Sequence, residues 1–249
     1  MGDKVLLVTG GGRGIGAATA RLAAARGWAV AVNYRANSLA ADEVVRAIRA
    51  DGGRAMALQA DVADEAQVLR MFEQVDARWG PLTGLVNNAG VVAGAAPLAA
   101  HEATRWRRLF EVNVIGSLLC AREAVRRMST AHGGAGGSIV NLSSAAARLG
   151  APHEYVDYAA AKGAIDAFTV GLAKEVAAQG IRVNAVRPGL IDTEIHASGG
   201  RPNRVQELQA SVPMGRGGSA QEVAEAIVWL LSDAASYTTM SLLDVSGAR

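Results

Sequence analysis

Length, composition and charge place this chain among globular proteins with a substantial buried core. It has 249 residues, of which 50% are hydrophobic, and its 25 basic and 23 acidic residues give a net charge of +2. This composition excludes a disordered chain and a strongly basic nucleic-acid-binding protein. One cysteine, Cys120, excludes an internal disulfide. No apolar run reaches the roughly 18 residues of a membrane span, so we expect no membrane partner and a cytoplasmic location.

Short apolar runs alternate along the chain with longer stretches of helical periodicity. The predicted strands cover residues 5–8, 28–34, 55–60, 85–88, 138–142, 181–186 and 242–245. The predicted helices cover 14–26, a segment capped by Ser38, a segment capped by Asp64, and residues 104–130, 157–179 and 220–232. Strands that alternate with helices indicate a doubly wound parallel sheet of the Rossmann type, with helices on both faces. No linker divides the chain, so we expect one domain over 1–249, with an irregular segment at 190–216 that covers the substrate.

A glycine-rich turn follows the first strand. It reads Thr-Gly-Gly-Gly-Arg-Gly-Ile-Gly over residues 9–16 and leads into the first helix. Such a turn lets the backbone approach a nucleotide pyrophosphate, which the free N–H groups of the helix start can bind. Ala17 and Ala18 stand where a P-loop needs Lys and Ser or Thr, so the turn is not that of a kinase or NTPase.

The end of the second strand indicates which dinucleotide binds. NAD sites place an acidic residue there for the ribose 2′-hydroxyl, whereas this strand ends Asn33-Tyr34-Arg35. Arg35, together with Arg13 of the glycine turn, can form charge-assisted contacts to a 2′-phosphate. We therefore expect NADP(H) to be preferred, with NAD(H) possible. The alternative is that both arginines are solvated surface charges.

Tyr158 and Lys162 are spaced i, i+4 near the start of a predicted helix. This spacing places both side chains on one helix face. A nearby ammonium group stabilises a phenolate and lowers the tyrosine pKa, so the pair can exchange a proton with an alcohol or a ketone. Taken alone, the pair could equally be an ordinary surface contact.

Several ordered motifs identify a family. They are Thr9-Gly10-x-x-x-Gly14-Ile15-Gly16, Asp61-Val62, Asn87-Asn88-Ala89-Gly90, Asn113, Ser143-Ser144, Tyr158-x-x-x-Lys162 and Pro188-Gly189. In this order, over nearly the whole chain, they resemble the short-chain dehydrogenase/reductase family in its short single-domain form. The resemblance implies hydride transfer between a nicotinamide and a small carbonyl or alcohol substrate, and a homotetramer or homodimer.

The resemblance also implies roles for individual residues. Tyr158 would be the acid and base, Lys162 would lower its pKa and bond the nicotinamide ribose, Ser144 would polarise the substrate carbonyl, and Asn113 would hold a water of a proton relay. Other residues would contact the cofactor: Gly10, Arg13, Gly14, Ile15 and Gly16 in the glycine turn, Arg35 at the 2′-phosphate, Asp61 and Val62 at the adenine, Asn87, Ala89 and Gly90 at the ribose, and Pro188, Gly189, Ile191 and Thr193 near the carboxamide. No metal is implied, and no residues have metal-ligand spacing.

The chain departs from the family pattern in three places. Ser144 lies 14 residues before Tyr158, one more than usual, which predicts a bulged loop and leaves Ser143 as a weaker rival to Ser144. Met240 replaces the usual glycine before the last strand, and the tail lacks paired glycines. Tyr155 has no lysine four residues on, so we assign it to the pocket or an interface.

Two functions remain open from the sequence. The first is an NADP(H)-dependent oxidoreductase, for which a sugar dehydrogenase and a 3-oxoacyl reductase are both similar. The second is a catalytically silent dinucleotide-binding sensor or scaffold. The segment 190–216 mixes apolar residues with Glu194, His196, Arg201 and Arg204, and no carboxylate clamp can be assigned from it. For the four histidines we expect structural or surface roles, with His101 peripheral.

Overall fold

The computed structural model describes residues 4–249. Seven strands form the central sheet, namely β1 (Val5–Val8), β2 (Ala29–Tyr34), β3 (Arg54–Gln59), β4 (Gly84–Asn87), β5 (Gly137–Leu142), β6 (Ile181–Pro188) and β9 (Leu242–Val245). Their spatial order is β3-β2-β1-β4-β5-β6-β9, and every neighbouring pair is parallel. The order reverses between β1 and β4, and the crevice at such a reversal is where ligands bind in open parallel sheets. The predicted fold class is confirmed.

The strands are mostly apolar because both faces of the sheet are covered. In β1, Val5 and Leu7 pack into the core on one face, whereas Leu6 and Val8 pack into the core on the other. This alternation follows from the two-residue period of a strand, and continuous apolar runs are typical of parallel sheets buried on both sides.

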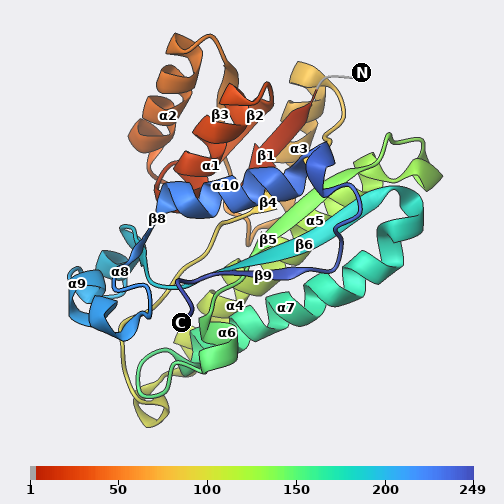
Figure 1. Cartoon of the computed structure of the whole chain (residues 1–249). Coiled ribbons are helices and arrows are strands. Elements are labelled where there is room, and N and C mark those ends of the chain that lie inside the picture. The colour runs from red at the N-terminus through yellow and green to blue at the C-terminus, as the bar shows by residue number, and fades with distance from the viewer. Residues whose placement is uncertain (1–3) are drawn as a thin grey trace.

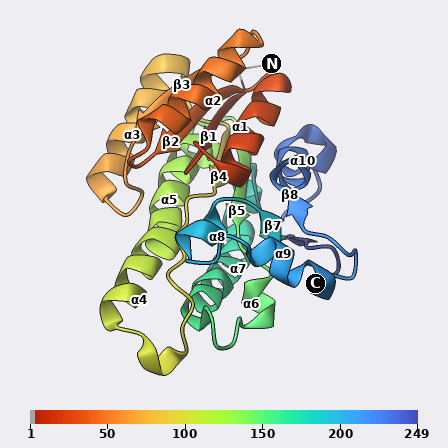
Figure 2. The same cartoon turned by 90° about the vertical axis from the view of Figure 1, so that its left-hand side faces the viewer.

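Helices form a layer on each face of the sheet (Figure 1). The first layer contains α1 (Gly14–Ala25), α2 (Ser38–Ala50) and α10 (Ala220–Leu231), and the second contains α3 (Glu65–Trp79), α5 (Gly116–Met128) and α7 (Val156–Val176). Figure 2 shows α3 and α5 on one side of the sheet and α10 on the other. Cys120 of α5 is buried, and desolvation raises the pKa of its thiol to about 12, so it is a packed residue as expected.

The helix caps confirm one prediction and correct another. Asp64 caps α3 and accepts a hydrogen bond from the Gln67 N–H. Asn37, not Ser38, caps α2, because the Asn37 side chain accepts from the Ala40 N–H and Ser38 is already the first helical residue. Both residue types are good caps, so the sequence alone does not choose between neighbours.

The long helix expected over 104–130 is not α-helical throughout. It consists of α4 (Ala103–Phe110), a π-helical turn (Glu111–Ile115) and then α5. Short 3-10 turns elsewhere cover Leu98–Ala100, Thr130–His132, Ala177–Gln179, Gln209–Ser211 and Asp233–Ala235.

The segment 190–216 is more regular than expected. It contains β7 (Ile191–Asp192), α8 (Ile195–Ser198) and α9 (Arg204–Leu208), and β7 pairs with β8 (Gly218–Ser219) in a small second sheet. A separate short helix, α6 (Ala146–Leu149), follows β5.

Candidate active site

A cavity of about 510 Å³ opens at the carboxyl ends of the central strands. The residues that follow β4, β5 and β6 contribute to its wall, as do the start of α7 and the segment 190–216. Three of the four predicted catalytic residues line it together, namely Ser144, Tyr158 and Lys162. The parallel topology explains this convergence, because all strands end at the same edge of the sheet.

Tyr158 and Lys162 lie one turn apart on α7, with the Lys162 Nζ 5.6 Å from the centroid of the tyrosine ring. Nζ donates a hydrogen bond of 2.6 Å to the Leu142 carbonyl at the end of β5. Desolvation raises the pKa of Tyr158 to about 12, and the Ser144 side chain acts against that rise. Desolvation also lowers the pKa of Lys162 to about 8, opposed by the Asp166 carboxylate. In both groups burial disfavours the charged form, since it raises the pKa of the tyrosine and lowers that of the lysine.

The two adjacent serines have different surroundings. Ser143 is buried, and its hydroxyl donates to the backbone carbonyl of Lys162 at 3.2 Å. Ser144 accepts a hydrogen bond from the Ala146 N–H at the start of α6 and lowers the pKa of Tyr158. Ser143 thus holds α7 against β5, and Ser144 is the serine beside the tyrosine.

The loop between Ser144 and Tyr158 accommodates its extra residue with unusual backbone angles. Ala151 and His153 have φ angles of 44° and 63°, in the left-handed region that non-glycine residues rarely adopt. The loop brings Glu154 and Tyr155 into the cavity wall, and the bulge that the spacing predicts stays a prediction.

Asn113 does not line the cavity. It is fully buried in the π-helical turn, where its side chain accepts from the Val91 N–H at 2.7 Å and donates to the Val91 carbonyl at 2.9 Å. A Cβ on Gly90 would lie 3.4 Å from the Asn113 Oδ1 and 3.8 Å from the Lys162 Nζ. Asn113 thus fixes the loop that faces Lys162, and its π-helical turn is of a kind common at functional sites.

The glycine turn has the shape that a pyrophosphate requires. Gly10 and Gly14 have φ angles of 61° and 51°, which favour glycine. A Cβ on Gly16 would lie 2.5 Å from the Gly10 carbonyl oxygen, so no side chain can stand there. Asn88 donates to the carbonyls of Thr9 and Gly10 and fixes the turn from β4. The residues present therefore fit a dinucleotide.

Arg13 and Arg35 lie on the surface beside this turn. Both are exposed, and within residues 4–249 neither guanidinium has a hydrogen-bond or ion-pair partner. Asp61 is differently placed, since its carboxylate accepts from the Arg108 Nη2 at 2.9 Å and from the Ala63 N–H. Arg13 at the start of α1 and Arg35 just after β2 are thus two exposed cations without a partner among the described residues.

The remaining predicted cofactor residues divide into two groups. Those that line the cavity are Ile15, Gly90, Pro188, Gly189, Ile191 and Thr193. Thr193 also reaches the glycine turn, because a Cβ on Gly14 would lie 3.3 Å from its Cγ2. Those outside the cavity wall include Val62, Ala89 and Asn87, whose amide donates to the Ser117 carbonyl and to Asn141 in the interior. Asn88 lines the cavity instead of Asn87, as the alternation along a strand requires.

Sequence reasoning missed a buried polar cluster behind the tyrosine. His101 was expected to be peripheral, but its side chain has 0% exposure and lies 3.8 Å from Asp157. Arg105 pairs with the same carboxylate at 2.6 Å. Arg105 and Asp157 are 52 positions apart in sequence, and no local pattern signals such a contact.

Comparisons with known proteins agree with this geometry. A family model described as "Enoyl-(Acyl carrier protein) reductase" matches residues 10–247. The chain belongs to the short-chain dehydrogenase/reductase family. It is therefore an NAD(P)-dependent oxidoreductase that acts on alcohol or carbonyl groups.

The chain is similar over its length to several relatives. It is 57% identical to the uncharacterized oxidoreductase YgfF of Escherichia coli K12, over 98% of this chain and 99% of the relative. It is 43% identical to the cis-4-hydroxycyclohexanecarboxylate dehydrogenase of Sinomonas cyclohexanicum, over 98% and 96%. A crystal structure of a dehydrogenase/reductase from Sinorhizobium meliloti 1021 superposes with a TM-score of 0.91 at 30% identity and covers 100% of this chain and 95% of that one.

The described residues offer neither a metal-binding group nor a membrane-spanning helix. Within residues 4–249, no group of three or more His, Cys, Asp or Glu side chains could hold a metal ion. In the same part of the chain, no helix combines the length and apolar character that a membrane crossing requires.

Proposed function

We propose that this protein is an NADP(H)-dependent dehydrogenase that interconverts a secondary alcohol and its ketone, with Tyr158 as the acid and base. The observation that carries the proposal is the meeting of Ser144, Tyr158 and Lys162 in one cavity beside a glycine turn that fits a dinucleotide. When bound, the nicotinamide supplies the hydride for reduction and accepts it in oxidation. The chain's own residues place the substrate and move the proton.

The proton step uses the tyrosine hydroxyl. In reduction, Tyr158 Oη gives its proton to the carbonyl oxygen as that oxygen gains charge, and in oxidation it takes the proton from the alcohol. The Lys162 ammonium, near the tyrosine ring, would oppose the desolvation that raises the pKa of Tyr158, and Ser144 would donate a hydrogen bond to the same substrate oxygen. Asn113 holds the Gly90–Val91 backbone that faces Lys162, and a water beside it would return the proton from solvent.

The cofactor preference rests on the unpaired guanidiniums of Arg13, in the glycine turn, and Arg35, just after β2. They would bind the 2′-phosphate of NADP(H), and NAD(H) would bind more weakly. Gly10, Gly14 and Gly16 would contact the pyrophosphate, Asp61 and Val62 the adenine, Ala89 and Gly90 the ribose, and Ile15, Pro188, Gly189, Ile191 and Thr193 the nicotinamide half.

A ring-shaped secondary alcohol is the substrate class we favour. The relative at 43% identity is named for a hydroxylated cyclohexane, and the cavity wall combines Val92, Leu149 and Leu208 with the polar residues of the catalytic end. We further propose a cytoplasmic homodimer or homotetramer. Exposed Trp106, Phe110 and Leu118 on the α4–α5 stretch supply an apolar face for subunit contact.

The test measures oxidation of a cyclohexanol, glucose and a 3-hydroxyacyl thioester with NADP⁺ and with NAD⁺, in wild type and in Tyr158→Phe. We expect the cyclic alcohol with NADP⁺ to give the highest kcat/KM, and the variant to lose at least 1,000-fold in kcat while it still binds NADPH by fluorescence titration. Retained turnover in the variant would overturn the role of Tyr158. Faster turnover of glucose or the thioester would replace the substrate class.

A further inference from the structure

A cluster of charged residues lies at the side of the cavity formed by segment 190–216. Glu154 accepts hydrogen bonds from Arg201 on one carboxylate oxygen and from the Arg204 Nη2, at 2.7 Å, on the other. Arg201 also pairs with the more exposed Glu207. Of these residues only Glu154 and Arg204 belong to the described cavity wall. Both oxygens of the acid in the wall are therefore already engaged by arginines.

Arg204 keeps a donor without an acceptor. Its Nη1 is buried and has no hydrogen-bond partner among the residues that the structure describes. The guanidinium lies over the ring of Tyr155, another wall residue, with its Cζ 5.1 Å from the ring centroid. Tyr155 and Glu154 thus hold the guanidinium in one orientation. A buried donor without a partner lowers stability, and an acceptor on a ligand would recover that loss.

The cavity wall as a whole carries more basic than acidic side chains. Its charged side chains among the described residues are those of Glu154, Lys162, Arg204 and Arg249, and both oxygens of the one acid are already paired. His196 is a further titratable residue of the wall, and its pKa is lowered by desolvation and by the positive charges of Arg204 and Arg201. Its ring nitrogen is already paired with the Ile191 carbonyl at 2.8 Å. A cationic ligand group would meet repulsion here, whereas a carboxylate would find the free donor.

We propose that Arg204 binds a carboxylate on the substrate, so that the enzyme selects alicyclic hydroxy acids, and their keto acids, over neutral ring alcohols. The inference rests on the proposed function for its chemistry and adds the second point of attachment. Tyr158 and Ser144 hold the reacting oxygen, and Arg204 holds the acid group elsewhere in the same cavity. A carboxylate oxygen on the substrate can accept from the unpartnered Nη1, while Nη2 stays on Glu154.

The kinetic test compares cis-4-hydroxycyclohexanecarboxylate with neutral cis-4-methylcyclohexanol. In wild type we expect the carboxylate to have the higher kcat/KM, mainly through KM. In Arg204→Gln we expect the ratio of the two kcat/KM values to fall at least tenfold, and in Arg204→Lys to fall less. The control is Arg201→Gln, which removes the other partner of Glu154 from outside the cavity wall and should leave the ratio unchanged. An equal fall in the control would overturn the proposal, because loosening of the cluster would explain it.

A binding measurement separates this inference from the proposed function. Cyclohexanecarboxylate has no hydroxyl to oxidise, so its affinity for the NADP⁺-saturated protein can be measured by calorimetry without turnover. We expect it to bind at least tenfold more tightly than neutral cyclohexanecarboxamide, which also has no hydroxyl, and to lose that advantage in Arg204→Gln. An equal affinity for the two compounds in wild type, or an unchanged advantage in the variant, would refute the carboxylate site. If the carboxylate binds through Arg204 but no ring alcohol is oxidised, the proposed function fails and the carboxylate site stands.

Discussion

Arg105 of α4 donates two hydrogen bonds to the carboxylate of Asp157, the residue that directly precedes Tyr158. Its Nε reaches Oδ2 at 2.6 Å and its Nη2 reaches Oδ1 at 3.1 Å, while its Nη1 donates to the Gly94 carbonyl. Asp157 Oδ1 also accepts from the Tyr158 N–H at 3.0 Å. Desolvation raises the pKa of Asp157, but these hydrogen bonds hold it below its ordinary value. One ion pair thus ties the loop after β4 to the helix start that presents the tyrosine.

Arg105→Met should misplace Tyr158 without touching the cofactor site. We expect kcat to fall about tenfold, the cost of roughly 1.4 kcal/mol in the barrier, with Kd for NADPH within twofold of wild type. Steady-state kinetics and fluorescence titration check the two halves separately. The matched control is Arg107→Met on the same helix, since Arg107 is exposed. A similar loss of kcat in the control would mean that charge on α4, and not the contact with Asp157, supports the rate.

Arg35→Ala should discriminate between the two cofactors. Charge-assisted hydrogen bonds are worth about 1.5–3 kcal/mol, so Kd for NADPH should rise roughly 10- to 100-fold. Kd for NADH should change less than twofold, because NADH has no 2′-phosphate. Arg21→Ala removes the same charge from an exposed position on α1 and should affect neither. If NADPH and NADH lose affinity equally in Arg35→Ala, the arginine does not meet the phosphate.

The sequence was sufficient for features that depend on neighbours in the chain. The run Val5–Val8 predicted a buried strand because its apolar residues are contiguous, and β1 has those bounds. The i, i+4 spacing predicted that Tyr158 and Lys162 share a helix face, and both line one cavity. These signals are local, so one sequence reveals them.

Features set by distant residues were not predictable. The π-helical turn in the long helix lies where Asn113 bonds to Val91, 22 residues earlier. The Arg204 guanidinium lies over the ring of Tyr155. Arg204 begins α9, whereas Tyr155 directly precedes α7. Helical periodicity at 104–130 is the same with or without such a contact. Only the tertiary packing decides whether a π-helical turn forms at Asn113. It also decides which arginine of segment 190–216 reaches the cavity.

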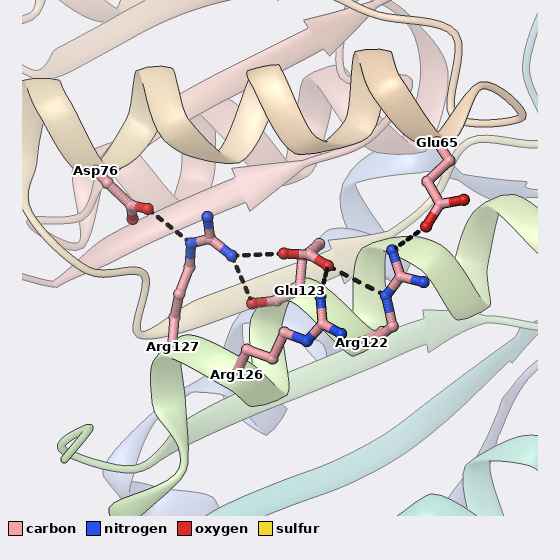
Figure 3. A network of polar contacts seen from close by, with 6 residues as sticks. All are labelled: Glu65, Asp76, Arg122, Glu123, Arg126 and Arg127. Carbon is pink, nitrogen blue, oxygen red and sulfur yellow. Dashed lines mark hydrogen bonds and ion pairs between the residues drawn. The ribbon is translucent and has the colours of Figure 1, made fainter. Parts of the chain in front are cut away.

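Glu123 is a buried carboxylate on α5 with a side chain only 3% exposed. It accepts hydrogen bonds from three guanidiniums around it (Figure 3), those of Arg122, Arg126 and Arg127. Two of these arginines also pair with acids of α3, namely Glu65 and Asp76 (Figure 3). Desolvation acts to raise the pKa of Glu123, but the arginines hold it below the ordinary 4.5. The network therefore needs the ionised form to join α3 to α5.

Glu123→Gln should destabilise the fold by about 2–4 kcal/mol at pH 7, because the guanidiniums lose their shared anion. Since the folded pKa lies below the unfolded one, the carboxylate stabilises the wild type above the unfolded pKa, and this contribution is lost as pH falls through the folded pKa. The difference in free energy of unfolding between wild type and variant, measured with urea, should therefore shrink from pH 7 to pH 3. Glu175→Gln, at an exposed position of α7, is the control and should show no such convergence. If the difference in unfolding free energy were the same at every pH, the charge of Glu123 would not be what stabilises the fold.

Met240 has a φ angle of 66°, in the left-handed region, immediately before β9. Its backbone cannot relax, because the Met240 N–H donates to the Val183 carbonyl at 2.7 Å and the Thr239 hydroxyl accepts from the Val183 N–H. Its side chain is 43% exposed. The left-handed conformation costs an L-residue about 1–2 kcal/mol, and the greater chain entropy of glycine offsets about 0.5–1 kcal/mol of that.

Met240→Gly should therefore stabilise the protein by about 0.5–1 kcal/mol, which corresponds to roughly 2 °C in Tm for a chain of this size. Thermal and urea unfolding measure the gain. Met240→Ala removes the same exposed side chain but keeps the strained backbone, so it should bring no increase. If the alanine variant gains as much as the glycine variant, the benefit comes from removing an exposed apolar side chain. The φ angle is the cause only if glycine alone raises the stability, because glycine alone relieves the left-handed backbone.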